Sequence, residues 1–425
     1  MPSSPASPLR LDDAAALAGR LRRQSGRRFR QLRRVWRPAE ARALSTRAAG
    51  AALRRLAPPD QLEVRAADVL AADLTRPRRH ERLAWRPGEA MTINWLMAPP
   101  SPGSGGHTTA FRLIRRLEEA GHLCRVYFYD VYGGDHAYYE SVVRRCFHDV
   151  RGGVHPLGDG MQDAHAVFAT SWQTAYPAYN DSSRGVRLYL VQDFEPSFYS
   201  AGAEQQLAEN TYRMGFHAIT AGPWLADKLA AEFSMRADAF AFGCDLERYH
   251  LAPSGPRDGI VFYARPEAPR RAYELGVMAL ELFAERRPDV TIHFYGRKTR
   301  ALRFPFVNHG LVDPDGLNRI YNRCWAGLSL SMTNVSLVPH EMLAAGCIPV
   351  VNDAVHNRQV LDNDHVSYAS PTPHALADAL EAVIAAPDAD AKAVAAAASV
   401  AGSSWDAAGD LVESVLRREL TTAAP

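Results

Sequence analysis

The sequence is poor in cysteine and lysine, and it has no long apolar run. Its 425 residues include five cysteines and only three lysines, at positions 228, 298 and 392. No stretch of 18 residues is apolar and free of charge, and Asp12 and Asp13 interrupt the N-terminal segment where a signal peptide needs its apolar stretch. We therefore expect a cytoplasmic protein without a membrane-spanning helix.

The cysteines are also too far apart for a metal site. Each cysteine is at least 22 positions from the next, so the sequence has no C-x-x-C pair. A structural zinc site needs four grouped Cys or His ligands, and this spacing supplies no such set. We expect a reducing compartment and no structural zinc.

Apolar residues are abundant enough for several globular domains. Hydrophobic residues make up 47% of the chain. At roughly 100–200 residues per domain, the length fits two or three domains, each with its own core. This composition excludes disordered, collagen-like and disulfide-scaffold proteins.

Charge is distributed unevenly along the chain. Residues 1–87 carry 20 arginines, no lysine and 8 acidic residues, a net charge of +12, which leaves −10 for residues 88–425. Arginines cluster between positions 22 and 37 around Phe29, Val35 and Trp36, and this pattern resembles a basic amphipathic helix on an anionic membrane. The alternative is a solvated arginine-rich helix. No nucleic-acid-binding module accompanies the charge, so we expect no nucleic-acid partner.

From residue 88 on, apolar runs typical of buried strands alternate with longer helical patterns. Such alternation predicts parallel sheets with helices on both faces, that is, an α/β fold. A segment rich in Gly, Pro and charge near 245–258 interrupts the alternation, which then restarts, so we expect two doubly wound, Rossmann-like domains. The expected strands are 91–98, 124–130, 164–170, 186–193, 217–221, 259–265, 290–296, 326–332 and 347–353.

These patterns divide the chain into four parts. Residues 1–87 are expected to form a helical extension, with helical stretches at 10–24 and 38–56. The two Rossmann-like domains are expected at 88–248 and 249–385, and an alanine-rich helical tail at 386–425.

The first loop after an expected strand is rich in glycine. Ligands of open parallel sheets bind beyond the carboxyl ends of the strands, so these loops are where a site is expected. Gly103, Gly105 and Gly106 precede a helix that His107 opens. Glycines let a ligand approach the backbone, and amides at a helix start attract phosphate. A plain strand-to-helix turn is the alternative, and a contact of His107 with sugar or phosphate competes with a simple capping role.

Cations follow two strands of the second half. Arg265 ends one expected strand and Arg270 follows it, while Lys298 follows the next strand along the chain. We expect these cations to converge on a diphosphate, because guanidinium groups and an ammonium match phosphate oxygens. Exposed charges at helix starts are the alternative.

An acidic residue begins a helix of small residues near position 341. Glu341 precedes Ala344, Ala345 and Gly346, which allow close approach of a ligand to the backbone. A carboxylate at this place accepts hydrogen bonds from vicinal hydroxyls such as those of a ribose. The alternative is a glutamate that only interacts with the helix dipole.

Six short blocks follow one another along the chain. They are GSGGH (103–107), QDFEP (192–196), GCDLERY (243–249), FYARP (262–266), GRK (296–298) and PHEMLAAGCIPVV (339–351). In this order they resemble the retaining, two-domain nucleotide-sugar glycosyltransferases of family 4. Within that family, the chain is most similar to bacterial rhamnosyltransferases of surface-glycan (S-layer glycan and O-antigen) assembly. The resemblance spans about residues 90–385.

The resemblance implies a glycosyltransferase-B architecture, in which two Rossmann-like domains face each other across a cleft. It assigns acceptor binding to the domain at 88–248 and donor binding to the domain at 249–385. It implies transfer of L-rhamnose from dTDP-L-rhamnose, with retention, to a hydroxyl of a glycan or lipid-linked glycan. The enzyme would then be peripheral on the inner face of the cell membrane.

The resemblance also implies roles for individual residues. Arg265 and Lys298 match the basic pair at the donor diphosphate, and Glu341 matches the carboxylate on the ribose. Gly105 and Gly106 match the loop that closes over the phosphates or the transferred sugar.

A second group of matches concerns the reacting sugar. Gln192 and Asp193 fall where many relatives have a His-Asp pair facing the sugar and the acceptor, and Asp193 or Glu195 is an alternative base or nucleophile. Thr333 replaces a glutamate that contacts donor sugar hydroxyls in relatives, which leaves the donor sugar open.

We expect metal-independent activity and no cofactor, because no D-x-D pair occurs in the candidate loops and the cations at the diphosphate supply the needed charge. Three alternatives remain: transfer from another nucleotide sugar, epimerisation of a sugar nucleotide, and non-catalytic glycan binding.

Overall fold

The computed structural model describes residues 62–158, 160–252 and 255–422. The helices expected at 10–24 and 38–56 lie outside the described residues. Within the described part, no helix is both long and apolar enough to cross a membrane.

The chain divides into two compact units. One combines residues 1–61 with Tyr132–Tyr138, and of this unit only Tyr132–Tyr138 is described, which includes the first residues of helix α5. The other combines Leu62–Val131 with Tyr139–Pro425. This second unit contains both sheets and the site discussed below.

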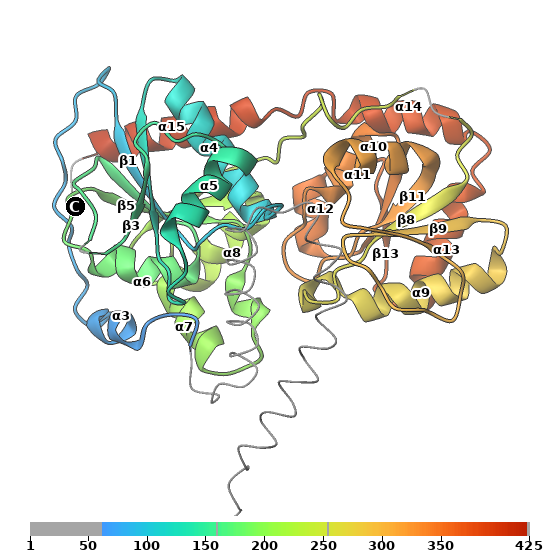
Figure 1. Ribbon diagram of the computed structural model, residues 1–425, viewed down its shortest axis with the longest axis horizontal. Helices are drawn as coiled ribbons and strands as arrows, with labels where there is room; N and C mark the ends of the chain where they lie inside the picture. Colours follow the sequence, from blue (N-terminus) through green and yellow to red (C-terminus); the bar gives the residue numbers. More distant parts are fainter. Residues whose placement is uncertain (1–61, 159, 253–254, 423–425) are drawn as a thin grey trace, which may run out of the picture. The chain divides into compact units, whose positions relative to one another are not determined.

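Seven parallel strands form the sheet of the first domain (Figure 1). Their spatial order is β3-β2-β1-β4-β5-β6-β7. The interior strands β1, β4, β5 and β6 are buried over nearly their whole length, because helices cover both faces of the sheet. The strands are β1 (Thr92–Met97), β2 (Leu123–Phe128), β3 (Val154–Pro156), β4 (Ala166–Ala169), β5 (Val186–Val191), β6 (His217–Ala221) and β7 (Ala237–Phe240).

The helices of this domain lie on opposite faces because the strand order reverses beside β1. Strands β2 and β3 follow on one side of β1, and β4 to β7 follow on the other. Right-handed crossovers that run in opposite directions place their helices on opposite faces. The helices are α3 (Ala66–Ala71), α4 (Gly105–Glu119), α5 (His136–Cys146), α6 (Trp172–Asn180), the 3₁₀ helix η1 (Glu195–Phe198), α7 (Ala203–Thr211) and α8 (Pro223–Phe233).

The second domain repeats this layout with six parallel strands in the order β10-β9-β8-β11-β12-β13. Here the order reverses between β8 and β11. The strands are β8 (Gly259–Tyr263), β9 (Thr291–Tyr295), β10 (Val307–Gly310), β11 (Cys324–Leu328), β12 (Ile348–Asn352) and β13 (Ser367–Ala369). The helices are η2 (Pro269–Arg271), α9 (Tyr273–Arg286), α10 (Pro314–Arg323), α11 (Val338–Ala344), α12 (Val355–Leu361) and α13 (Pro373–Ile384).

The two Rossmann-like domains confirm the fold expected from the sequence, and all nine expected strands are present. The structure adds four strands that were not expected, namely β3, β7, β10 and β13. Each of them is an edge strand of its sheet.

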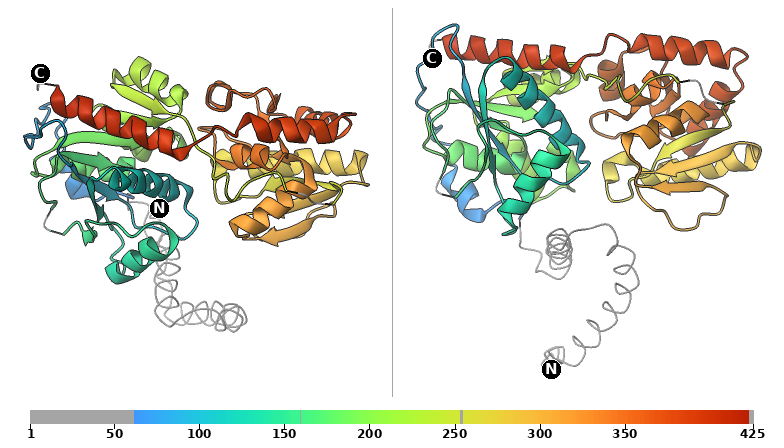
Figure 2. Two further views of the ribbon diagram at one scale, coloured as in Figure 1. Left: turned by 90° about the horizontal axis from the view of Figure 1, so that it is seen from above. Right: turned by 45° about the horizontal axis from the view of Figure 1, so that its top comes forward.

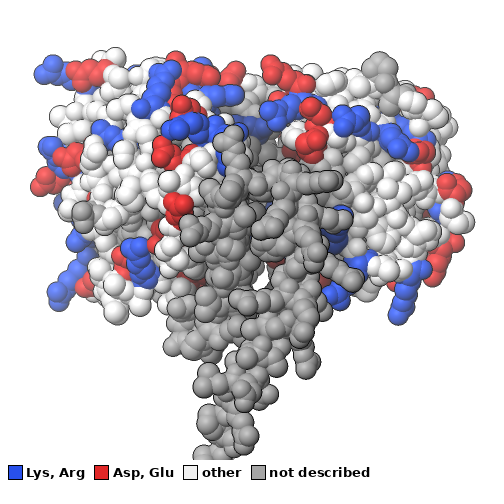
Figure 3. All heavy atoms as spheres, viewed as in Figure 1, with Lys and Arg blue, Asp and Glu red and all other residues white. Residues whose placement is uncertain are grey.

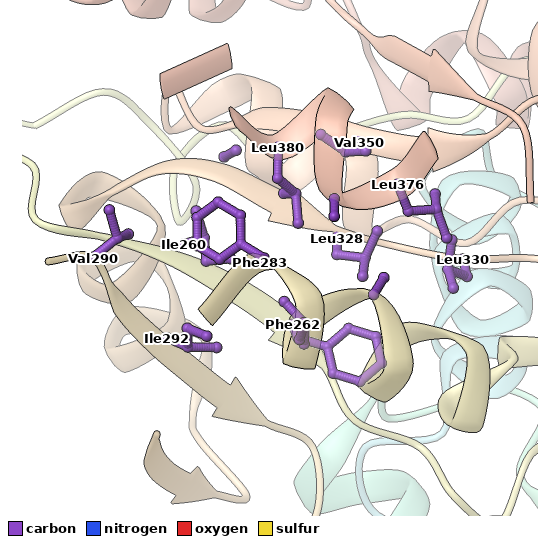
Figure 4. Packing of buried hydrophobic residues seen from close by; sticks show 14 of the residues in the cluster. Ile260, Phe262, Phe283, Val290, Ile292, Leu328, Leu330, Val350, Leu376 and Leu380 are labelled. Atoms are coloured by element: carbon purple, nitrogen blue, oxygen red, sulfur yellow. The ribbon is translucent and has the colours of Figure 1, made fainter. Parts of the chain in front are cut away.

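The core of the second domain lies between its sheet and the helices α9 and α13 (Figure 4). Apolar side chains of β8 and β11, such as Ile260, Phe262 and Leu328, meet Phe283 of α9 and Leu380 of α13. All five side chains are at most 1% exposed. This packing holds the carboxyl ends of the strands, and the loops that follow them, in fixed positions.

Helix α9 approaches the sheet closely at a glycine. A Cβ added at Gly276 would lie 2.5 Å from Cζ of Phe262, whose ring is buried. We therefore expect Gly276→Val to lower the free energy of unfolding by about 1–3 kcal/mol, because overpacking forces the helix or the ring to move. Urea unfolding measures the effect. Gly402→Val is the control, since a Cβ there meets nothing within 4 Å. Equal stability of the two variants would contradict this packing.

Both ends of the described chain pack on the first domain. Residues 62–87, expected within a helical extension, contain only the short helix α3 and otherwise run in non-helical conformation. Arg65 donates to the backbone oxygen of Asp130, and Asp68 accepts from the hydroxyl of Tyr129. A truncation that keeps these contacts therefore begins no later than Leu62.

The C-terminal tail contains two helices, α14 (Ala389–Ser399) and α15 (Trp405–Thr421). Helix α15 lies along α4 of the first domain (Figure 2). Ion pairs join the two parts, for example Arg116 with Asp410 at 2.7 Å and Arg236 with Glu419 at 2.9 Å. The end of the chain thus belongs to the packing of the first domain.

Candidate functional site

A cavity of about 1000 Å³ lies at the carboxyl ends of strands from both sheets. Loops after β1, β4 and β5 line it from the first domain, and loops after β8, β9 and β10 line it from the second domain. Ligands of open α/β sheets bind at this place, next to the reversal of strand order. The charged side chains of the lining are Arg112, Asp193, Glu195, Asp245, Arg248, Arg265, Glu267, Arg270, Arg271 and Glu341.

Arg265 lines the cavity just after strand β8. Its Nε lies 2.6 Å from Oε1 of Glu267, and its Nη1 donates to the hydroxyl of Tyr263 at 2.7 Å. These contacts fix the direction of a guanidinium group that is 37% exposed. A preset, partly exposed guanidinium of this kind is suited to bind phosphate oxygens.

Lys298 does not line the cavity, although Gly296 on the same strand end does. Its side chain is exposed, and its Cγ would lie 3.2 Å from a Cβ added at Gly310. In the residues described, we find no ion pair that involves Lys298. The structure therefore brings Arg265 to the cavity lining, and Lys298 lies outside that lining.

Two further arginines, Arg270 and Arg271, also line the cavity. Arg270 Nε is 3.4 Å from Oδ2 of Asp193, and its guanidinium lies 4.3 Å from the centre of the Phe198 ring. Arg271 donates from Nη1 to the hydroxyl of Ser331 at 2.8 Å. Burial lowers the pKa of Arg271 from its ordinary value.

Glu341 lies in the first turn of α11 and lines the cavity. Burial raises the pKa of its carboxyl group to about 7, and the neighbouring Arg112 opposes this shift. Arg112, from helix α4, is 3.4 Å from Oδ2 of Asp245. The carboxylate of Glu341 thus lies near a guanidinium of the first domain.

The glycine loop leads into helix α4, which begins at Gly105 rather than after the glycines. Gly105 and Gly106 line the cavity and belong to the first turn of α4, whose backbone N–H groups have no partner within the helix. The side chain of Gln192 donates to the backbone oxygen of Gly106 at 3.0 Å. This contact joins the start of α4 to the loop after β5.

The ring nitrogens of His107 have partners in the same loop. Nδ1 lies 2.8 Å from Oγ of Ser104, and Nε2 lies 2.9 Å from the backbone oxygen of Ala98. His107 lines the cavity. Its hydrogen bonds join the imidazole ring to the glycine loop and to the end of β1.

The two acidic residues after β5 have different surroundings. Asp193 accepts at Oδ1 from the backbone N–H groups of Phe194 and Asn334, both at 2.9 Å. Glu195 accepts from the backbone N–H of Trp172 at 2.5 Å and from the hydroxyl of Tyr189 at 3.0 Å. Burial raises the pKa of Glu195 to about 8. These bonds hold Glu195 against the start of α6.

Thr333 does not line the cavity. Its side chain is 4% exposed, and its hydroxyl has no hydrogen-bond partner among the described residues. The resemblance associates position 333 with sugar contacts. In this chain the side chain at that position is buried in the protein instead.

Sequence reasoning missed Arg112 and Asp245 of the lining. Arg112 lies in a helical pattern beside Arg115 and Arg116, where a surface arginine is the simplest interpretation. Asp245 lies in a segment that we interpreted as a linker. Their meeting at 3.4 Å is a tertiary contact between distant segments, and of the two residues only Asp245 lies in one of the six blocks, GCDLERY.

The cavity lining offers no obvious metal site. Among residues 62–158, 160–252 and 255–422, no group of three or more His, Cys, Asp or Glu side chains is placed to hold an ion.

Comparison with known sequences finds two matches. Residues 258–381 match the family model described as the C-terminal domain of WsaF. The O-antigen biosynthesis protein RfbC of Myxococcus xanthus is 33% identical over 217 residues, which cover 49% of this chain. The matched region spans only 17% of RfbC.

Several solved structures share the fold. TarM of S. aureus has a TM-score of 0.63 at 9% identity over 79% of this chain and 100% of its own. Anabaena HepE in complex with UDP and glucose has a TM-score of 0.59 at 14% identity, with coverage of 78% and 100%. A putative UDP-N-acetylglucosamine 2-epimerase from Listeria monocytogenes has a TM-score of 0.52 at 10% identity, with coverage of 79% and 98%. The chain therefore has the glycosyltransferase-B fold.

Proposed function

We propose that this chain is a retaining glycosyltransferase that moves L-rhamnose from dTDP-L-rhamnose to a hydroxyl of a growing bacterial surface glycan. The main supporting observation is the position of Arg265 and Glu341 on the lining of one cavity at the carboxyl ends of both sheets. The similarity to RfbC, named for O-antigen biosynthesis, supports the glycan, and HepE was solved with UDP and glucose, which supports a nucleotide sugar.

The donor is held by residues of the second domain in this proposal. Glu341 accepts hydrogen bonds from the ribose hydroxyls. Arg265 and Lys298 bind the diphosphate, with Arg270 beside them. Thr333 is turned away from the cavity, and this agrees with a 6-deoxy sugar that needs fewer polar contacts.

The proposed reaction breaks the bond between the anomeric carbon and the diphosphate oxygen, and the electron pair leaves with the diphosphate. The acceptor oxygen forms the new bond to the anomeric carbon on the same face, and its proton passes to a diphosphate oxygen. Negative charge develops on the diphosphate, so cations preset at that place stabilise the transition state more than the ground state. No metal or cofactor takes part.

Residues of the first domain orient the acceptor in this scheme. The backbone at Gly105 and Gly106 approaches the sugar or the phosphates, and His107 holds that loop in place. Gln192 and Asp193 face the reacting sugar, while Glu195 supports them from the start of α6.

The proposal is tested by incubating the protein with dTDP-L-rhamnose and a glycan acceptor and determining the anomeric configuration of the product by NMR. Glycoside formation with the donor's configuration is expected. An inverted product would contradict retention, and no transfer from any nucleotide sugar would contradict the enzyme class. An epimerase, which shares this fold in Listeria monocytogenes, would convert the donor without an acceptor.

Chelation tests the metal-independent mechanism separately. We expect the same rate of transfer in EDTA as in Mg²⁺ or Mn²⁺, because the arginine and lysine side chains supply the positive charge. Loss of activity in EDTA with rescue by Mn²⁺ would show instead that an ion takes part.

We also propose that the arginine-rich N-terminal residues bind the inner face of the cell membrane. On the face seen in Figure 3, the described residues interleave basic and acidic side chains. The excess positive charge of the sequence lies in residues 1–87, whose net charge is +12. Basic segments bind anionic lipids with an energy that salt reduces.

Vesicle pelleting tests this membrane contact. The full chain should sediment with phosphatidylglycerol vesicles at low salt and be released at high salt, whereas a variant that begins at Leu62 should stay in solution. Phosphatidylcholine vesicles are the control. Equal sedimentation of both forms would show that the N-terminal residues do not bind the membrane.

A further inference from the structure

One fully buried residue joins the two domains beneath the cavity. Asn334 lies in the loop between β11 and α11 of the second domain and is 0% exposed. Its side-chain Nδ2 donates to the backbone oxygens of Gln192 at 2.9 Å and Ala221 at 2.8 Å. These oxygens lie at the carboxyl ends of β5 and β6 in the first domain.

The backbone N–H and carbonyl oxygen of Asn334 are also hydrogen-bonded. Its N–H donates to Oδ1 of Asp193 at 2.9 Å, which is a third bond to the first domain. Its carbonyl oxygen accepts from Arg271 Nη1 at 3.2 Å and from the hydroxyl of Ser331. Its side-chain oxygen accepts from the N–H of Val335. Every polar atom of Asn334 therefore has a partner.

These bonds continue to the glycine loop. Asn334 fixes the backbone of Gln192, and the side chain of Gln192 in turn donates to the backbone oxygen of Gly106 in the first turn of α4. On the other side, Asn334 lies four residues before α11, which presents Glu341. Two helix N-termini that line the cavity, those of α4 and α11, are thus linked through one asparagine.

We propose that Asn334 is a positioning residue that sets the acceptor-side residues Gln192, Asp193 and Gly106 relative to the donor-side residue Glu341. An asparagine side chain suits this task because its amide supplies two donors, one for each strand end, and no charge. A misplacement of about 1 Å between reacting groups costs about 10²-fold in rate. The kinetic part of this inference rests on the proposed sugar transfer.

Kinetics of Asn334→Ala provide the first test. We expect kcat to fall about 10- to 10²-fold while KM for the donor stays within about threefold, since Arg265 and Glu341 remain in the second domain. Asn334→Asp keeps the size but places a carboxylate against two carbonyl oxygens, so it should lose at least as much activity. A rise in donor KM with unchanged kcat would contradict the positioning role.

Asn352→Ala is the matched control. Asn352 is 2% exposed and bonds both the N–H and the oxygen of Ser331 at 2.8 Å, entirely within the second domain. Both variants lose buried hydrogen bonds and should lose stability. Only Asn334→Ala should lower kcat of the folded protein. An equal decrease of kcat in both variants would mean that the lower stability alone causes the decrease, and it would contradict the positioning role.

Hydrogen exchange tests the inference without sugar transfer. In Asn334→Ala, exchange should rise at residues 104–112 and 190–198 of the first domain, and in Asn352→Ala it should rise only in the second domain. Unchanged exchange at both segments in Asn334→Ala overturns the inference, even if transfer is observed. Conversely, absence of transfer in the unmodified protein with the expected exchange pattern overturns only the proposed function.

Gln192→Ala covers the case in which the Asn334 variants do not fold. Gln192 is only partly buried, so its removal is a smaller risk to the fold. The substitution deletes the hydrogen bond from Nε2 of Gln192 to the backbone oxygen of Gly106, which is the last bond on the way from Asn334 to the glycine loop. Exchange should rise at residues 104–112, and unchanged exchange there contradicts the link.

Discussion

Replacing Arg265 by alanine is expected to lower the rate of sugar transfer by about 10²-fold, as does the loss of other preset charge-stabilising groups in enzymes. The guanidinium group lines the cavity, and Tyr263 and Glu267 fix its direction before the donor arrives. Because charge on the diphosphate grows as the glycosidic bond breaks, the loss should appear mainly in kcat. Steady-state kinetics with saturating acceptor measure it.

Arg297→Ala is the matched control for this variant. Arg297 is a neighbouring arginine that pairs with the same Glu267 at 3.5 Å, but its side chain is 60% exposed and does not line the cavity. We expect near-normal turnover for Arg297→Ala. Lys298→Ala should also lower the rate by about 10²-fold, because the proposal places its ammonium group at the diphosphate. Near-normal turnover in Arg265→Ala would remove this residue from the mechanism.

Replacing Glu341 by alanine should weaken donor binding about 10- to 10²-fold at pH 8, because hydrogen bonds to a charged group contribute about 1.5–3 kcal/mol. In the proposed complex the ionised carboxylate accepts from both ribose hydroxyls. Isothermal titration with the nucleoside diphosphate alone measures the change. Undiminished affinity would show that Glu341 does not contact the nucleotide.

The pKa of about 7 for Glu341 gives this binding a pH dependence. Below pH 7 the carboxyl group of the free protein is largely protonated, so donor affinity should rise from pH 6 to pH 8. Glu341→Gln cannot ionise and should show no such rise. The same rise in Glu341→Gln would assign the titration to another group.

The contribution of Glu341 to the free energy of unfolding should change with pH in the direction opposite to donor affinity. The folded-state pKa of Glu341 is raised above its ordinary value of 4.5, so its stability contribution is fully present below pH 4.5 and is lost as pH rises through 7. Glu341→Gln should therefore unfold with a higher free energy than the unmodified protein at pH 8, on the order of 1–3 kcal/mol. Urea unfolding at pH 5 and pH 8 measures the difference.

The interior of each sheet was predictable from the sequence, and its edges were not. Interior strands such as β1 and β8 are buried on both faces, so they appear as continuous apolar runs. The four missed strands, β3, β7, β10 and β13, have three or four residues each and few buried positions. An edge strand has one neighbour and is partly solvated, which leaves no apolar run to recognise.

The candidate site was also predictable only in part. Arg265, Glu341 and the glycines of the first loop were predictable because each follows a strand, and the carboxyl ends of parallel strands meet at one edge. Thr333 and Lys298 follow strands too, but the direction of a side chain in a loop depends on its packing, which turns Thr333 inward. The roles of Arg112 and Asn334 depend on contacts between segments more than 100 residues apart, which no local pattern indicates.

The most direct test of the account is a thermal-shift screen of the full chain against a panel of nucleoside diphosphate sugars, repeated with Arg265→Ala and Glu341→Ala. A ligand that binds only the folded state raises the melting temperature by mass action. We predict that a dTDP-linked sugar raises the melting temperature of the unmodified protein and that both variants lose most of this increase. A panel without any stabilising nucleotide sugar, or equal stabilisation of all three proteins, would contradict the assignment of this cavity.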